Sequence, residues 1–189
     1  MNKIKNINKK ILNFLDVIFV GEYKKYSLFF TAMIDSVIAI LPTDLIVAYY
    51  FLREKKASVF YQSIAIGLGS VIGGSLLYFL ANEIIQIFPS ILNSEYYLKI
   101  QEILKYSFWI QFFMVVFFAF TSLIPFIWLS ILLGAFNFSY FIIYWPAMFL
   151  GRFLRFFLIA WLTKKYGQDV VEKISTGFWN LIYFLKRKK

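Results

Sequence analysis

Cysteine and histidine are absent from the 189-residue sequence, and only 16% of the residues are charged. Without cysteine there is no disulfide, no thiol nucleophile and no thiolate metal site. Without histidine there is no imidazole base, no Ser-His triad and no ordinary zinc site. We therefore expect no metal and no cofactor, and much familiar enzyme chemistry is excluded.

Apolar residues are abundant instead. They make up 61% of the sequence, and aromatic residues alone make up 22%, whereas a soluble domain averages about 45–50% apolar residues. A soluble domain of this size cannot bury so much apolar surface, so the composition predicts an integral membrane protein. The net charge is +10. The basic residues cluster beside apolar runs, which is typical of a cytoplasmic membrane face rather than of nucleic-acid binding.

The first long apolar run, 26–52, is interrupted near its centre by Pro42 and Thr43. The run is long enough to cross a bilayer core of about 30 Å. However, Asp35 and Asp44 lie on either side of its middle, and proline removes a helix hydrogen bond. Basic clusters lie on both flanks, so a simple span would place one of them outside. We therefore expect a re-entrant hairpin that enters and leaves on the cytoplasmic side and lines a cavity.

The next segment, 57–81, is typical of an ordinary transmembrane helix. Gly69 and Gly73 form a small-xxx-small pair, and Gly74 follows directly. This pattern lets helices approach closely, so we expect these glycines to lie at a helix contact. The polar segment 82–105 is the expected external connection.

The second long apolar run, 106–136, repeats the pattern of the first. Ser122 and Pro125 lie in its middle, which predicts a second re-entrant hairpin that enters from outside; one kinked spanning helix is the alternative. The last expected span is 138–163. A hairpin followed by a span thus occurs twice in opposite orientation, which is the inverted-topology architecture of many secondary transporters.

Both ends of the sequence are basic and amphipathic. Residues 1–25 are expected to lie on the membrane surface as a helix, and 164–189 as a basic tail. A signal peptide is the alternative for the first segment, but Asp16 interrupts its apolar stretch. The predicted fold is an all-α integral membrane protein with a single membrane domain over 26–163. That domain is an inverted repeat of a re-entrant helical hairpin plus a transmembrane helix, with amphipathic terminal helices.

Four charged residues are predicted at membrane depth. Arg152 and Arg155 are one turn apart in the last span and share one helix face. Each charge at a helix centre costs about 2.5–3.5 kcal/mol, so the arginines need carboxylate partners or water. We expect them to meet Asp35 and Asp44 in one hydrated cavity, where the guanidinium groups match a phosphate and a carboxylate can gain and lose a proton. The alternative is an ion-pair set that only fastens the first hairpin to the last span.

Three motifs follow one another along the chain. They are Asp35-Ser36 with Ile40-Leu41-Pro42-Thr43-Asp44, then Gly69-Ser70-Val71-Ile72-Gly73-Gly74 with Tyr78, and then Gly151-Arg152-Phe153-Leu154-Arg155 with Tyr166-Gly167. Over residues 11–170 the chain thereby resembles the DedA superfamily, also called the VTT-domain or SNARE-associated Golgi protein family. The third motif is similar to the YqaA branch in particular.

The resemblance implies two re-entrant hairpins in an inverted repeat, a bacterial cytoplasmic membrane with both termini cytoplasmic, and a role in membrane homeostasis. Relatives in the wider family are linked to moving lipids between leaflets, including recycling of the polyprenyl-phosphate carrier and scrambling of phospholipids. Ile127 departs from the pattern, because the branch tends to have a basic residue two positions after the proline that corresponds to Pro125. If that basic residue helps to hold the substrate in the family, we expect this chain to have reduced or altered activity.

Three classes of function remain for comparison. The first is movement of an anionic lipid or another small anion across the bilayer, linked to protons; helix N-termini near Thr43 and Pro125 favour anions. The second is an intramembrane aspartyl hydrolase, which is disfavoured because Gly67-Leu68-Gly69-Ser70 lacks the acid of a Gly-x-Gly-Asp element. The third is a non-catalytic assembly or scaffold protein whose basic ends bind anionic lipid. We expect the partners to be membrane lipids with anionic head groups, and we expect no nucleic acid among them. The sequence leaves open whether the chain forms a homo-oligomer.

Overall fold

The computed structural model describes residues 24–38, 42–87, 98, 102 and 107–167. Within these ranges the chain is helical and has no strand, which confirms the predicted all-α class. Residues 1–23 of the predicted surface helix, residues 168–189 of the predicted tail and much of the external segment 82–105 lie outside the described residues. The first residues of the predicted tail, up to Tyr166, continue α9. The helices are α2 (Lys24–Ile38), α3 (Thr43–Arg53), α4 (Val59–Phe79), α5 (Ala81–Ile87), α7 (Phe108–Thr121), α8 (Phe126–Ala135), the π-helical turn η2 (Tyr140–Tyr144) and α9 (Trp145–Tyr166).

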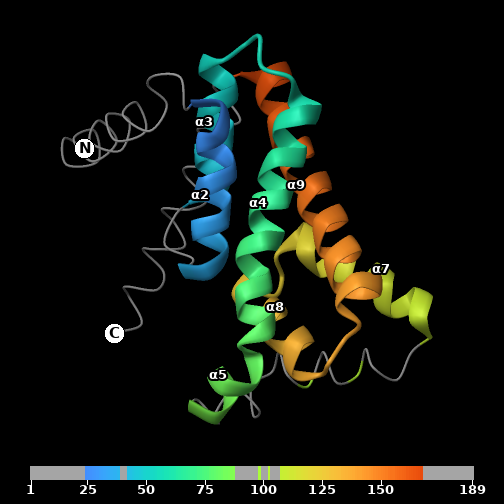
Figure 1. The fold of residues 1–189 in the computed structure, drawn as a ribbon. Coiled ribbons are helices and arrows are strands. Elements are labelled where there is room, and N and C mark those ends of the chain that lie inside the picture. The colour runs from blue at the N-terminus through green and yellow to red at the C-terminus, as the bar shows by residue number, and fades with distance from the viewer. Residues whose placement is uncertain (1–23, 39–41, 88–97, 99–101, 103–106, 168–189) are drawn as a thin grey trace, which may run out of the picture.

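Two of the described helices are long and apolar enough to cross a membrane. One is α4 with 21 residues, and the other is the 26-residue helix Phe141–Tyr166, which joins η2 to α9. At about 1.5 Å per residue, each is long enough for the roughly 30 Å hydrocarbon core. They coincide with the predicted spans 57–81 and 138–163. Figure 1 shows α4 and α9 side by side and running in opposite directions.

Each of the two long apolar runs contains two shorter helices with a break between them. The break between α2 and α3 ends at Pro42, and the break between α7 and α8 ends at Pro125. Both prolines directly precede a helix, where a missing N–H removes no helical hydrogen bond. Ser122 has a left-handed φ of 53° at the end of α7. The chain therefore leaves helical geometry inside 106–136, rather than continuing as a single kinked helix.

The two broken pairs approach the middle of the molecule from opposite ends. In Figure 1, α2 begins and α3 ends at the end where α9 also ends. At that end Lys164 of α9 donates hydrogen bonds to the carbonyl oxygens of Lys55, at 2.8 Å, and Ala57 in the α3–α4 loop. The last turn of α8 lies at the other end, because a Cβ on Gly134 would collide with the Tyr78 carbonyl oxygen near the end of α4.

Helix packing is reciprocal between two halves of the chain, of which the first contains α2, α3 and α4 and the second contains α7, α8 and α9. α2 packs along α4 and α7 packs along α9, whereas α3 packs on α9 and α8 packs on α4. A Cβ on Gly69 or Gly73 of α4 would collide with carbonyl oxygens of α2. A Cβ on Gly151 of α9 would lie 2.6 Å from the Val116 carbonyl oxygen of α7. Glycine thus permits the close backbone approach in both halves.

The buried apolar side chains form two main clusters along α9. One cluster contains Ile46 and Phe156 and joins α3 and α2 to α9. The other contains Leu129 and Met148 and joins α8, α7 and α4 to α9. Arg152 lies between Met148 and Phe156 in the sequence, so the charged part of α9 lies where one apolar cluster gives way to the other.

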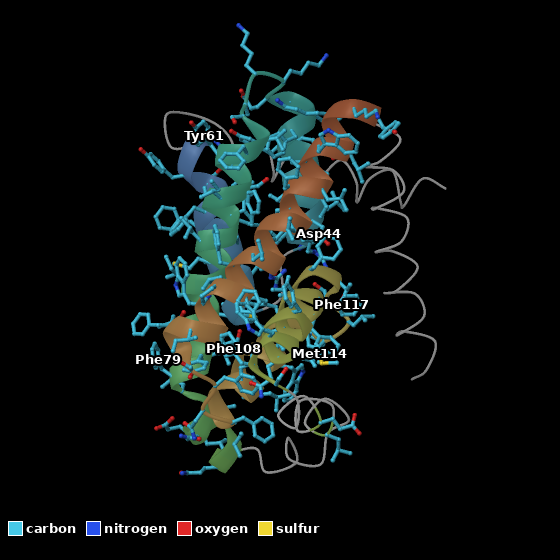
Figure 2. All side chains as sticks on the ribbon, turned by 90° about the vertical axis from the view of Figure 1, so that its right-hand side faces the viewer. Asp44, Tyr61, Phe79, Phe108, Met114 and Phe117 are labelled. Carbon is cyan, nitrogen blue, oxygen red and sulfur yellow. The ribbon has the colours of Figure 1, made fainter. Side chains whose placement is uncertain are left out.

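Large apolar side chains also cover the outside of the helices. Tyr61 is 73% exposed and Phe79 is 63% exposed, and Phe117 of α7 is exposed as well. In Figure 2 Asp44 lies at a height between Tyr61 near one end and Phe79 near the other. An apolar exterior with a carboxylate at mid-height favours a lipid environment over water.

Candidate functional site

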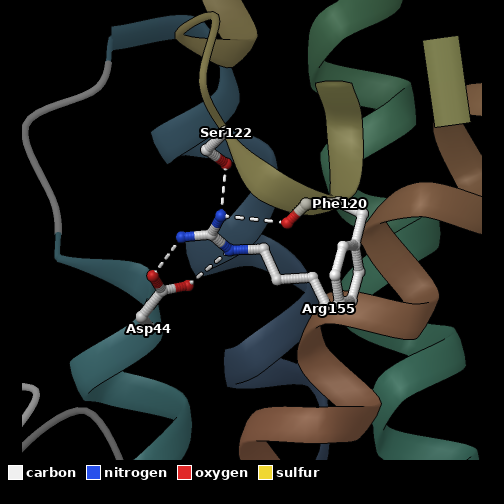
Figure 3. Close-up of polar contacts among 4 residues, drawn as sticks. All are labelled: Asp44, Phe120, Ser122 and Arg155. Carbon is white, nitrogen blue, oxygen red and sulfur yellow. Dashed lines mark hydrogen bonds and ion pairs between the residues drawn. The ribbon is translucent and has the colours of Figure 1, made fainter. Parts of the chain in front are cut away.

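Arg155 of α9 bonds to residues at both helix breaks (Figure 3). Its Nε donates to Asp44 Oδ1 at 3.1 Å, and its Nη2 donates to Asp44 Oδ2, which makes a bidentate ion pair. Its Nη1 donates to the Phe120 carbonyl oxygen at 3.2 Å and to Ser122 Oγ. We call Asp44, Phe120, Ser122 and Arg155 the Arg155 junction. One side chain thereby connects the start of α3 with the end of α7.

The ends of two helices make the Arg155 junction electrostatically favourable. Asp44 lies in the first turn of α3, where no side chain caps the helix and its positive dipole end stabilises a carboxylate. The Phe120 carbonyl lies in the last turn of α7, where carbonyl groups lack a helical partner and attract a cation. Ser122 ends α7 in the left-handed conformation and accepts a hydrogen bond from Arg155 through Oγ. Local helix geometry thus prepares both sides for a guanidinium group.

The Arg155 junction is only partly enclosed. The side chain of Arg155 is 21% exposed and that of Asp44 is 31% exposed. The bidentate arrangement fixes the relative orientation of the two groups. Its partial exposure means that water can replace the hydrogen bonds when the pair separates.

Arg152 lies one turn before Arg155 but has a different environment. It is only 7% exposed. Its guanidinium carbon lies 3.8 Å from the centre of the Phe126 ring and 5.7 Å from the centre of the Phe156 ring. Its Nε is buried and has no hydrogen-bond partner among the residues that the structure describes. Aromatic faces, rather than carboxylates, therefore form its direct surroundings.

The four charged residues expected to meet are brought together in different ways. Asp44 forms an ion pair with Arg155. Arg152 lies close enough to interact electrostatically with Arg155 and with both Asp44 and Asp35. Asp35 is half-buried on α2. The structure therefore gathers the four charges in one region and pairs Asp44 directly with Arg155.

The residues expected at the helix breaks occupy equivalent places in the two halves. Pro42 and Pro125 directly precede α3 and α8, and Thr43 is the buried first residue of α3. Asp44 and Ile127 each lie two residues after a proline, in the first turn of the following helix. The two halves therefore share this geometry but differ in charge.

Two hydroxyl groups and a glycine lie close to the Phe126 ring. Tyr144 donates a hydrogen bond to Ser130 Oγ at 3.3 Å, and both residues are buried. A Cβ on Gly74 would lie 2.7 Å from Phe126 Cε1 and 2.8 Å from the hydroxyl oxygens of Ser130 and Tyr144. Gly74 therefore leaves the space that this polar group of side chains occupies.

Four of these contributors were not predicted from the sequence. Phe120 acts through its backbone carbonyl, which no side-chain pattern reveals. Tyr144 and Ser130 lie in apolar runs and carry no distinctive spacing. Phe126 follows Pro125 directly, and an aromatic residue at a break opposite two arginines was an available signal for a cation–π contact.

The end of the molecule where α3 and α9 finish is basic and aromatic. A cavity of about 500 Å³ opens there, and Lys55, Lys164, Lys165 and Tyr166 contribute to its lining. The Lys165 ammonium lies 4.9 Å from the centre of the Trp161 ring. Lysines with Trp and Tyr are typical of the cytoplasmic interface of a membrane protein.

No group of metal-ligating side chains able to hold an ion occurs in the described part of the chain. No protein-family model, curated protein or solved structure matches this chain. Its class therefore comes from fold and site alone. Over the described residues it is all-helical, with two helices able to cross a membrane and a charged junction between two broken helix pairs.

Proposed function

We propose that this chain is a DedA-like integral membrane protein that moves an anionic lipid across the bilayer, either a polyprenyl phosphate or a phospholipid. Movement of another small anion is the broader form of the same proposal. The observation that carries it is the Arg155 junction, in which one guanidinium group bonds to both helix breaks. A charged connection between two broken helices at mid-height is an arrangement suited to transport.

Membrane insertion is supported by three features of the described residues. Two helices are long and apolar enough to cross a bilayer, large aromatic side chains are exposed, and the basic end carries Lys55, Lys164 and Lys165. By the positive-inside rule we assign this end to the cytoplasm. Since α2 begins and α3 ends there (Figure 1), the arrangement supports a re-entrant hairpin that enters and leaves on the cytoplasmic side. The resemblance to the DedA superfamily adds the bacterial cytoplasmic membrane.

The inverted repeat is supported by the reciprocal packing. Helix pairs α2–α4 and α7–α9 correspond, as do α3–α9 and α8–α4. The long helices α4 and α9 run in opposite directions (Figure 1). In such repeats the substrate site lies near the midplane where the two halves meet, and the Arg155 junction lies at this meeting point.

The junction suggests how movement is linked to protons. A proton on Asp44 removes the negative charge that holds Arg155, so the bidentate pair weakens. The two breaks then separate, and a phosphate head group passes between them while its acyl or prenyl chain stays in the lipid. Loss of the proton restores the ion pair and closes the path. Each transport cycle needs both the open and the closed arrangement, so a variant that cannot form the ion pair does not complete the cycle.

A reconstitution assay tests this proposal. Purified protein is placed in liposomes, and the transbilayer movement of a labelled polyprenyl phosphate and a labelled phospholipid is followed at two pH values. The parent is expected to accelerate movement of at least one lipid, and Asp44→Asn to lose most of this acceleration. Glu83→Gln removes an exposed acid on α5 and is the matched control. No acceleration by correctly folded parent protein would overturn the proposal.

A non-catalytic assembly or scaffold role is the second candidate. One observation favours it, because all three guanidinium nitrogens of Arg155 are used in fastening helix ends together. In that case the basic end would bind anionic lipid and the junction would only stabilise the fold.

A further inference from the structure

The two arginines of α9 differ in how their hydrogen-bond donors are used. Every guanidinium nitrogen of Arg155 donates to Asp44, Phe120 or Ser122. Because an arginine has only five N–H groups, little donor capacity remains there. In Arg152, by contrast, the Nε is buried and has no hydrogen-bond partner among the described residues, and the residue is only 7% exposed.

A buried guanidinium N–H without a hydrogen-bond acceptor is energetically unfavourable. Removing it from water has a cost that a cation–π contact recovers only in part. Arg155 demonstrates that α9 can hold a fully bonded arginine one turn away. The incomplete bonding of Arg152 therefore indicates that a ligand supplies its acceptors.

The first turn of α8 lies next to Arg152. The Phe126 ring, over which the guanidinium group lies at 3.8 Å, belongs to the first residue of this ten-residue helix. No side chain caps α8 at this end, so its first N–H groups favour an anion. Ile127 brings no positive charge to this turn, so Arg152 supplies the positive charge that would attract an anion there.

We infer that Arg152 and the first turn of α8 bind the phosphate group of the substrate, whereas Arg155 holds the helix breaks together and does not bind it. This inference rests on the proposed function and assigns separate roles to two arginines of the same region. Arg152 offers parallel N–H groups to two phosphate oxygens, and α8 offers backbone N–H groups to a third. The hydroxyl groups of Ser130 and Tyr144 lie beside the Phe126 ring and add polar character to the site.

Equilibrium binding in nanodiscs of neutral phosphatidylcholine tests this assignment separately from transport. The probes are a short-chain polyprenyl phosphate, its neutral alcohol and inorganic phosphate, and binding is measured by native mass spectrometry. Arg152→Gln is expected to weaken binding of the lipid phosphate at least tenfold, and Arg152→Lys to weaken it less. Glu83→Gln removes an exposed charge from α5, and it is expected to bind as the parent does. The neutral alcohol is expected to bind weakly to every variant.

Equal binding of the lipid phosphate by the parent and Arg152→Gln would overturn the assignment. So would loss of binding in a folded Arg155→Lys protein with Arg152 intact, because the phosphate would then depend on Arg155. Inorganic phosphate that binds as tightly as the lipid phosphate would overturn the lipid as the source of the phosphate group. Binding that depends on Arg152 without lipid movement would contradict the proposed function and leave the site standing. Lipid movement that does not depend on Arg152 would contradict the phosphate site and leave the proposed function standing.

Discussion

The ion pair between Asp44 and Arg155 predicts a strong thermodynamic coupling between these residues. Removing one partner of a fully buried pair costs about 3–5 kcal/mol, whereas an exposed pair contributes about 0–1 kcal/mol. The two side chains are 31% and 21% exposed. We therefore expect Asp44→Asn to lower the free energy of unfolding by about 1–3 kcal/mol, because the charge left on Arg155 is partly solvated.

Arg155→Gln is expected to cost more than Asp44→Asn. It removes the ion pair and also the hydrogen bonds to Phe120 and Ser122, each worth about 0.5–1.5 kcal/mol. The total loss is about 2–6 kcal/mol. In the double variant no charge of the pair is left without its partner, so its loss should not exceed that of Arg155→Gln alone. The coupling energy is then about 1–3 kcal/mol.

Reversible unfolding in mixed detergent micelles measures this cycle. Increasing the fraction of denaturing detergent unfolds the protein, and tryptophan fluorescence reports the transition for the parent, both single variants and the double variant. Glu83→Gln is the control, since this acid is exposed and its loss should leave the transition unchanged. Additive losses, with a coupling energy near zero, would refute the claim that the two charges support one another.

Three further predictions follow from packing, burial and topology. Gly73→Ala should destabilise the protein by about 1–3 kcal/mol in the same unfolding assay, because its Cβ would collide with a carbonyl oxygen of α2. Gly67→Ala should cost less, since its Cβ would meet a movable Phe149 ring at 3.3 Å. Equal losses of stability in the two variants would contradict the packing account. Arg152→Met should unfold at a denaturant fraction equal to or above that of the parent without ligand, because it removes a buried charge that lacks acceptors; a large loss would show that this charge stabilises the fold. A single cysteine introduced by Lys56→Cys, in this cysteine-free chain, should react with an impermeant maleimide only from the cytoplasm, and labelling from outside would contradict the first hairpin.

The sequence predicted the helix breaks because proline and charge are both unusual inside an apolar run. Pro42 and Pro125 marked the two places where helices begin, and the spans 57–81 and 138–163 agree with the two long helices. The burial cost of charges also pointed to a carboxylate near the arginines. These signals are local or depend on simple energetic rules, so a single sequence contains them.

The distribution of roles between the arginines required three-dimensional geometry. Arg152 and Arg155 share a helix face, and sequence spacing gave them the same role. Their difference depends on the Phe120 carbonyl and on the position of the Phe126 ring. Both depend on how the two halves dock, which the periodicity of either half does not encode.

Lipid movement by the paired neutral variant tests the central claim most directly. Liposomes containing equal amounts of inserted parent protein or Asp44→Asn/Arg155→Gln protein are compared with protein-free liposomes, using the labelled polyprenyl phosphate and the labelled phospholipid. If the charges of the Arg155 junction serve transport, the double variant should move lipid no faster than protein-free liposomes, although it remains folded. Movement at the parent rate would contradict this account and would show that the junction only fastens the helices.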